Sequence, residues 1–268
     1  MAEGPYRPKP SRERRPNPHR RPPLRPFTTT LWEYPSQQYG DGRQGNKNYT
    51  GATPSWVIWQ LLTRYTREND IVVDPMCGSG TTLDVAKDLG RRAKGFDLNP
   101  QRDEITYNDA RALPLDDASC DCVFIDPPYS THVRYSDDPA CIGTLDSGGA
   151  DHGQAYYDAM ASVIAEIHRV LRDKRYMGLY VSDSYKKNAP PGQRFMPIGF
   201  ELFSIMRQYF EPVDIVAVVR RNQKLGRGAW HRAAEEGNFF MRGFNYLFIM
   251  KKDGSRRGPG GRGPRGAR

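Results

Sequence analysis

Several features that would place this chain elsewhere in the cell are missing from it. The 268 residues contain no apolar run of the ~18 residues that a membrane-spanning helix needs. The N-terminus also lacks the apolar segment of a secretory signal. Cysteines are few, at positions 77, 120, 122 and 141, and none form a CxxC pair. We therefore expect a cytoplasmic protein with no membrane contact, reduced thiols and no metal site. Cys120 and Cys122 are expected to face opposite sides of one strand.

Excess positive charge is missing from the middle of the chain. Residues 27–252 carry 27 Lys/Arg and 28 Asp/Glu, whereas the whole chain has a net charge of +9. The excess lies in residues 1–26, with a net +6, and in residues 253–268, with a net +4. Both segments are rich in Arg with Pro or Gly, which predicts two disordered tails around one domain at 27–252. Such tails bind phosphates without reading sequence, although they could equally serve only solubility.

A glycine-rich segment lacks the marks of the two best-known nucleotide loops. It follows an apolar strand candidate and has neither the third glycine of a dinucleotide fingerprint nor the Gly-Lys-Ser/Thr of a P-loop. Its glycines would still let a ligand approach the backbone closely. Asp97 ends the next strand candidate, where nucleotide-type α/β folds place a carboxylate on ribose hydroxyls. The segment reads Asp74, Pro75, Met76, Cys77, Gly78, Ser79, Gly80, Thr81, Thr82.

A second motif, Asp126-Pro127-Pro128-Tyr129, follows the apolar run 122–125. The first proline fixes φ and has no N–H, so the chain turns stiffly there. A planar amine could donate to the Asp126 carboxylate and to the Pro127 carbonyl, while Tyr129 stacks on the ring that carries the amine. This combination suits the exocyclic amino group of a nucleobase. The alternative is an ordinary surface turn after a strand.

Apolar runs and helical periodicity alternate along the rest of the domain. This alternation predicts a mainly parallel, doubly wound sheet. The last two strands are expected to form an antiparallel pair joined by a long loop without a helix, and residues 27–48 an ordered arm. Ligands bind outside the carboxyl ends of such strands, where Asp74, Asp97, Asp109 and Asp126 would gather. The expected strands are 71–74, 93–97, 105–108, 122–125, 177–182, 213–219 and 246–250, and the expected helices 56–65, 82–89, 151–171 and 197–210.

The ordered set of motifs resembles the S-adenosylmethionine-dependent amino-methyltransferases of nucleic acids. The glycine loop precedes Asp-Pro-Pro-Tyr, as in the gamma-type order of the N6-adenine and N4-cytosine DNA methyltransferases, and the resemblance covers roughly residues 28–252. It implies the Rossmann-like, seven-stranded class I methyltransferase fold, a mostly parallel sheet with an antiparallel terminal strand. It also implies S-adenosylmethionine as the cofactor.

The resemblance assigns the cofactor-binding residues. Residues 74–82 would wrap the methionine part, Asp97 would bind the ribose, and Leu98 would pack on the adenine. Asn108, Asp109 and Ala110 would touch the adenine edge. Residues 49–54 lie where these enzymes carry an element that closes the pocket; alternatively, Thr53 or Ser55 simply caps the helix that follows.

The implied activity is methyl transfer to adenine N6 or cytosine N4 in DNA, with Asp126, Pro127, Pro128 and Tyr129 as the catalytic motif. Arg134 and Tyr135 would belong to a lid over the base, and Arg220, Arg221 and Trp230 to a nucleic-acid face. DNA enzymes that read sequence carry a sizeable recognition region, for which this chain has little room. The same chemistry on ribosomal or other structured RNA is therefore the close alternative, and an inactive nucleic-acid-binding protein the less favoured one. The oligomeric state stays open.

Overall fold

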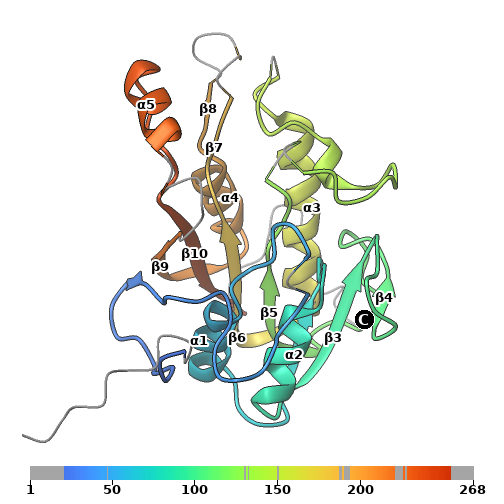
Figure 1. Cartoon of the computed structure of the whole chain (residues 1–268). Helices are drawn as coiled ribbons and strands as arrows, with labels where there is room; N and C mark the ends of the chain where they lie inside the picture. The colour runs from blue at the N-terminus through green and yellow to red at the C-terminus, as the bar shows by residue number, and fades with distance from the viewer. Residues whose placement is uncertain are drawn as a thin grey trace, which may run out of the picture.

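The computed structural model describes residues 21–46, 48–129, 131, 133–149, 151–186, 189, 194–220, 226 and 228–254. Eight strands form one central sheet, with helices on both of its faces (Figure 1). A small two-stranded sheet stands beyond it. In spatial order the large sheet contains β1 (Leu31–Trp32), β9 (Glu211–Val219), β10 (Phe244–Lys251), β6 (Leu171–Val181), β5 (Cys120–Ile125), β2 (Ile71–Asp74), β3 (Arg92–Asp97) and β4 (Ile105–Tyr107).

Most neighbouring strands of this sheet run parallel. The exception is β10, which pairs antiparallel with both β6 and β9. The order from β4 to β9 therefore confirms the predicted fold class, a mostly parallel sheet with an antiparallel terminal strand. The sheet has eight strands rather than seven because the N-terminal arm adds β1, whose two residues pair with β9.

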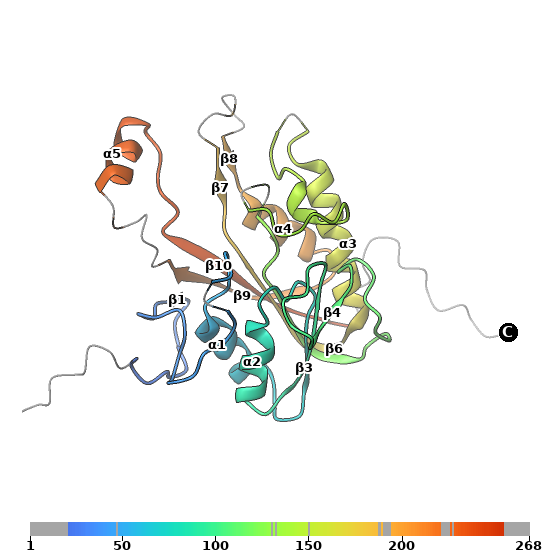
Figure 2. The same cartoon turned by 45° about the vertical axis from the view of Figure 1, so that its right-hand side comes forward.

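Each face of the sheet has its own hydrophobic core. Helices α1 (Ser55–Tyr65) and α2 (Thr81–Asp88) cover one face, and α3 (Gln154–Val170) and α4 (Ile198–Met206) cover the other. The views in Figures 1 and 2 agree on this layering. Strand β5 is buried along its whole length, as expected of a central strand whose two faces are both covered.

A hairpin, a 3₁₀ turn and a helix lie at or beyond the carboxyl edge of the sheet. The short hairpin β7 (Ser184–Tyr185) and β8 (Phe195–Met196) follows β6, and the 3₁₀ turn η1 (Ile142–Thr144) follows the Asp126 motif. Helix α5 (Gly228–Glu236) lies between β9 and β10, so the prediction of a loop without a helix is wrong there. Its residues include no buried side chain, which is why hydrophobic periodicity gave no signal for it.

The N-terminal boundary of the domain also differs from the prediction. Residues 21–26, assigned to the tail, contact the domain: Arg21 donates to the Gly40 and Gly42 carbonyls, and Gln60 donates to the Arg25 carbonyl. These residues therefore belong with the arm. Residues 1–20 and 255–268 lie outside the described residues. In the described part of the chain, none of the helices is long and apolar enough to span a bilayer.

Candidate active site

A single open cavity at the carboxyl edge of β2, β3 and β5 brings the predicted motifs together. Its empty volume, which includes the space at the open mouth, is about 850 Å³. Both the glycine loop and the Asp126 motif contribute to its wall. The predicted residues that line it are Asp74, Pro75, Met76, Cys77, Gly78, Ser79, Thr81, Thr82, Asp97, Leu98, Asn108, Asp109, Ala110, Asp126, Pro128 and Tyr135.

Backbone geometry explains the glycines of the loop. Gly78 has φ +50°, and a Cβ there would lie 2.9 Å from Cε1 of Tyr49, so only glycine fits. Its N–H donates to Oδ2 of Asp97 at 2.8 Å. Gly80, with φ +81°, directly precedes α2 and does not itself line the cavity. The loop is thus fixed to the end of β3 while its backbone faces the cavity.

Two carboxylates at the cofactor end are held by local donors. Asp74 accepts from Oγ1 of Thr82 at 2.5 Å and from the Met76 N–H at 3.1 Å. Burial raises the pKa of Asp74 to about 7, even though these two hydrogen bonds act to lower it. Asp97 also accepts from the Asn99 N–H, and burial raises the pKa of Asp97 as well.

Asp126 is held from two directions. Thr53 Oγ1 donates a short hydrogen bond to Oδ2, and the Tyr129 hydroxyl donates to Oδ1 at 2.6 Å. Burial raises the pKa of the Asp126 carboxyl to about 7, although Thr53, Tyr129 and the charge of Arg220 all act to lower it. The Tyr156 hydroxyl donates to the Pro128 carbonyl at 2.8 Å, which fixes the backbone of the motif from α3.

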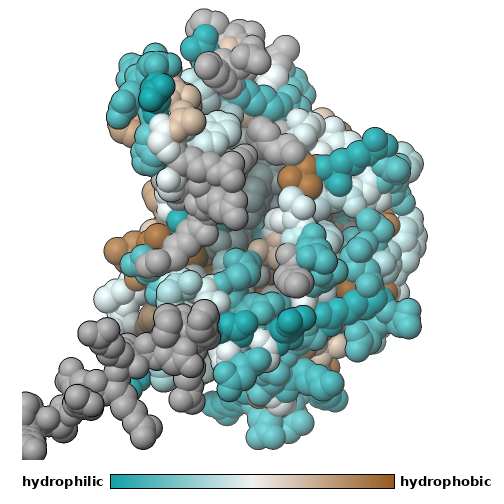
Figure 3. All heavy atoms as spheres, viewed as in Figure 1, coloured by the Kyte–Doolittle hydropathy of each residue, from teal (hydrophilic) through white to brown (hydrophobic). Residues whose placement is uncertain are grey.

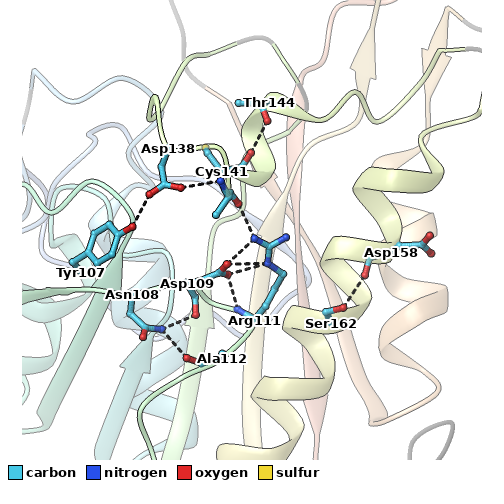
Figure 4. A network of polar contacts seen from close by, with 11 residues as sticks. Tyr107, Asn108, Asp109, Arg111, Ala112, Asp138, Cys141, Thr144, Asp158 and Ser162 are labelled. Atoms are coloured by element: carbon cyan, nitrogen blue, oxygen red, sulfur yellow. Dashed lines mark hydrogen bonds and ion pairs between the residues drawn. The ribbon is translucent and has the colours of Figure 1, made fainter.

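Polar contacts at the end of β4 fasten the segment that follows the Asp126 motif (Figure 4). Asp109 forms a bidentate ion pair with Arg111, whose guanidinium also donates to the Ala140 carbonyl at 3.0 Å. The Tyr107 hydroxyl donates to Asp138 at 2.6 Å. Asp109 therefore orders the cavity wall through Arg111 in addition to lining the cavity.

The N-terminal arm covers the glycine loop. The Gly45 N–H donates to Asp84 of α2 at 2.7 Å, and the Gln44 side chain donates to Asp88. Tyr49 lies over Gly78 and 6.5 Å, centroid to centroid, from the Tyr135 ring. The arm and the segment after the Asp126 motif thus meet above the cavity.

Not every predicted site residue lies in the cavity wall. Pro127 is buried, and Tyr129 touches the site through Asp126. Arg134 is 79% exposed and paired with Asp137, away from the cavity. Trp230 lies on α5, 42% exposed, and Arg221 lies outside the described residues. Arg220 is not in the wall either, but its charge acts on Asp126.

Sequence reasoning missed two contacts that shape the site. Thr53 appeared as a candidate helix cap, yet α1 has no side-chain cap and Thr53 serves Asp126 instead. Tyr156 was not singled out at all. Both partners lie far from the motif in sequence, so only the folded arrangement could reveal them. Among the described residues, no group of three or more His, Cys, Asp or Glu could hold a metal ion.

The cavity fits S-adenosylmethionine. Its three carboxylates, Asp74, Asp97 and Asp126, provide negative charge for a cationic ligand. Leu98, Ala110 and Ile142 add apolar surface for an aromatic ring.

Comparison with known proteins points to methyltransferases. Residues 3–108 match the family model described as DNA methylase (N6_N4_Mtase). The type II methyltransferase M2.LlaDCHI of Lactococcus lactis subsp. cremoris is 33% identical over 76 residues, which is 23% of this chain and 28% of that protein. M.HinfI of Haemophilus influenzae is 35% identical over 54 residues, covering 20% of this chain and 15% of that protein. The matches thus span less than a third of the length of these relatives.

Among solved structures, TrmN from Thermus thermophilus aligns with a TM-score of 0.47 at 16% identity, covering 76% of this chain and 50% of that chain. The strand order is that of the predicted fold class, and the partial family match shows that the chain is similar to methyltransferases. Within that class, the family match and the curated relatives support the predicted resemblance to the DNA amino-methyltransferases. The gamma-type assignment of the motif order stays a prediction.

Proposed function

We propose that the protein transfers a methyl group from S-adenosylmethionine to the exocyclic amino group of a base in DNA, adenine N6 or cytosine N4. The observation that carries this proposal is that Asp126 lines the same cavity as Asp97 and the glycine loop. A base whose amino group reaches Asp126 is thereby brought next to the cofactor. The partial matches to type II DNA methyltransferases support DNA as the substrate.

The protein's task is to position a poor nucleophile. S-adenosylmethionine, when bound, supplies an electrophilic methyl group. The lone pair of an exocyclic amino nitrogen delocalises into the base, and hydrogen bonds from that group to Asp126 and to the Pro127 carbonyl would favour a more tetrahedral nitrogen. Thr53 and Tyr129 hold the carboxylate in place for this contact, so less orientation has to be gained during the reaction.

In this assignment Tyr129 does two things. Its hydroxyl is bound to Asp126, which fixes the position of the hydroxyl end of the ring, and the ring can then hold the base by stacking. A base in a duplex would first have to leave the stack, at a cost of a few kcal/mol.

The decisive assay uses tritiated S-adenosylmethionine, with total DNA and total RNA offered in parallel and the labelled nucleoside identified by mass. N6-methyladenine or N4-methylcytosine in DNA would support the proposal and name the base. Label found only in RNA would replace DNA by RNA as the substrate. Label in neither polymer would contradict the proposed activity.

The role of Asp126 has its own test. Asp126→Ala should abolish methyl transfer, because the amino group loses its acceptor, while binding of S-adenosylmethionine measured by calorimetry persists. Loss of both methyl transfer and cofactor binding would instead show that Asp126 is needed for the structure of the pocket.

A further inference from the structure

Two segments beyond the carboxyl edge of the sheet lie against each other. They are the β7–β8 hairpin and residues 237–244, which lead from α5 into β10. The rings of Tyr185 and Phe239 stack at 5.3 Å with an interplanar angle of 16°. Arg242 lies over the Phe195 ring, 5.3 Å from its centroid. Figures 1 and 2 show the hairpin and α5 rising together past the end of the sheet.

This surface, which we name the aromatic ridge, consists of Tyr185, Phe195, Phe239, Phe240 and Phe244. Phe240 is 86% exposed, Phe195 47% and Phe244 43%. Large rings clustered on the surface mark interaction sites more often than isolated exposed residues do. The face of the molecule seen in Figure 3 is mostly hydrophilic. We therefore expect the ridge to bind a partner that covers flat apolar rings.

Charge around the ridge identifies the chemistry of that partner. The described residues of the segments 184–196 and 220–232 include four cations, Lys186, Arg194, Arg220 and Arg232, and no Asp or Glu. The acidic residues next in sequence are Asp183, directly before the first segment, and Glu235 and Glu236, at the end of α5. Cations beside exposed rings suit a partner that combines negative charge with flat π-surfaces.

The ridge is connected to the candidate catalytic carboxylate. The Arg220 N–H donates to the Gly243 carbonyl at 2.9 Å, and its guanidinium donates to Oγ of Ser182 at 3.4 Å. The charge of the same guanidinium acts on Asp126. A strand that lies along the ridge would therefore pass close to the base bound at Asp126.

We propose that the aromatic ridge binds unpaired nucleotides that flank the target base, with their bases stacked on Phe240 and Phe195 and their phosphates held by the neighbouring cations. This inference rests on the proposed function, because it takes a nucleic acid as the substrate. Bases inside a duplex have both faces covered by their neighbours, so exposed rings can stack only on a single-stranded or opened region. The site thus selects locally unpaired substrate.

Fluorescence anisotropy with the full-length protein tests the ridge. The probes are labelled single-stranded DNA of about 12 nucleotides, RNA of the same sequence, and the matching DNA duplex. Salt of about 0.3 M weakens the sequence-independent contribution of the Arg-rich termini. The variants are Phe240→Ala and Phe240→Leu, which remove the ring, and Phe240→Tyr, which keeps it. Leu31→Ala on β1, the edge strand that pairs with β9, removes a side chain that is 62% exposed and serves as the control.

We expect single strands to bind more tightly than the duplex. Phe240→Ala and Phe240→Leu should weaken single-strand binding by about fivefold to a hundredfold, the range for loss of one stacked base. Phe240→Tyr and Leu31→Ala should bind as the wild type does. Tighter binding of the duplex would overturn the proposal. So would full affinity in Phe240→Leu, since that would show an apolar contact without stacking.

Failure of this inference can be separated from failure of the proposed function. In the Asp126→Ala background, Phe240→Ala should still weaken single-strand binding by the same factor, because the ridge residues are unchanged in it. Binding that depends on the Phe240 ring, without any methyl transfer, would support the role of the ridge and contradict the proposed activity. Methylation of nucleic acid together with unchanged binding in Phe240→Ala would support the proposed activity and contradict the proposed role of the ridge.

Discussion

At the scale of single residues, the site depends on one carboxylate that the fold brings into several contacts at once. Asp126 follows β5, while its partner Thr53 precedes α1, a separation of 73 residues. Neighbouring Tyr129 occupies the other oxygen. Each carboxylate oxygen has more than one acceptor position, so Asp126 can bind an incoming amino group without losing either contact.

Thr53→Val should lower kcat, because it removes a hydrogen bond to a charged group from a side chain of similar size. Such a bond contributes about 1.5–3 kcal/mol, which corresponds to a loss of roughly tenfold to a hundredfold. The acid limb of the pH–rate profile should also move to higher pH, because Thr53 lowers the pKa of Asp126. Thr53→Ser keeps the hydroxyl donor and should restore both kcat and the position of the acid limb. Unchanged kcat in Thr53→Val would show that the contact is incidental.

The pH dependence of turnover follows from the raised pKa of Asp126, about 7. Only the ionised form offers full acceptor capacity, so kcat should fall as the pH drops through about 7, with the rate measured from pH 5.5 to 9. Asp74, with its pKa also raised to about 7, contributes to the same limb. A profile that stays flat down to pH 5 would mean that the catalytic form does not require these carboxylates.

The same pKa shifts act in the opposite direction on the free energy of unfolding, which they lower as the pH rises. Asp74 and Asp126 have higher pKa values in the folded protein than in the unfolded chain, so the folded state binds more protons between pH ~4 and ~7. Their contribution to the free energy of unfolding therefore decreases as the pH rises through this window. The ligand-free protein carries this cost at the pH where the site is active.

At the scale of elements, the glycine loop and the arm form the cofactor end of the cavity together. Gly78 has left-handed φ, and its Cα faces the Tyr49 ring. Gly78→Ala should thus lower the affinity for S-adenosylmethionine by more than tenfold, because the loop or Tyr49 must move and the backbone strain costs about 1–2 kcal/mol.

Gly228→Ala is the matched control for that prediction. A Cβ at Gly228 meets nothing within 4 Å, and the residue begins α5, far in sequence from the loop. Calorimetric titration with the cofactor should give the wild-type dissociation constant for Gly228→Ala. Wild-type affinity in Gly78→Ala as well would show that the arm adjusts freely.

Elements with strong local signals were predictable, and those that depend on distant contacts were not. Strand 71–74 has the predicted bounds, because an apolar run there meets a glycine loop. Strand β1 has two residues and exists only because β9 offers an edge. The role of Thr53 likewise had no local signal. The motif residues themselves were predicted because their chemistry is concentrated in short segments.

Cys120 and Cys122 show how a local rule can fail. Residues two apart share a face in a regular strand, so alternation alone would have put both thiols on one side. In the structure Cys120 belongs to the core under α3, and Cys122 to the core under α1. The register shift between them in the pairing of β5 with β6 accounts for this. The predicted opposite placement is confirmed, but the irregularity produces it.

At the scale of the whole molecule, the excess positive charge lies in the two ends of the sequence, and Arg194 adds a cation next to Phe195 of the ridge. Arg194→Gln, in an exposed residue preceding β8, should reduce the slope of log affinity for single strands against log salt by about 0.7. Arg92→Gln, on exposed Arg92 at the start of β3, removes the same charge elsewhere and should leave the slope unchanged. Anisotropy titrations at several salt concentrations measure both. Equal slopes for the two variants would show that binding does not use this end of the molecule.

The arm is fastened on both sides of the cavity, by β1 on β9 upstream and by Thr53 on Asp126 downstream. A segment held at both ends is restrained before any ligand binds, so the part of the wall that it supplies to the open cavity should change little on binding. Cofactor and by-product should therefore exchange without a slow opening step, and the first turnover should show neither a lag nor a burst.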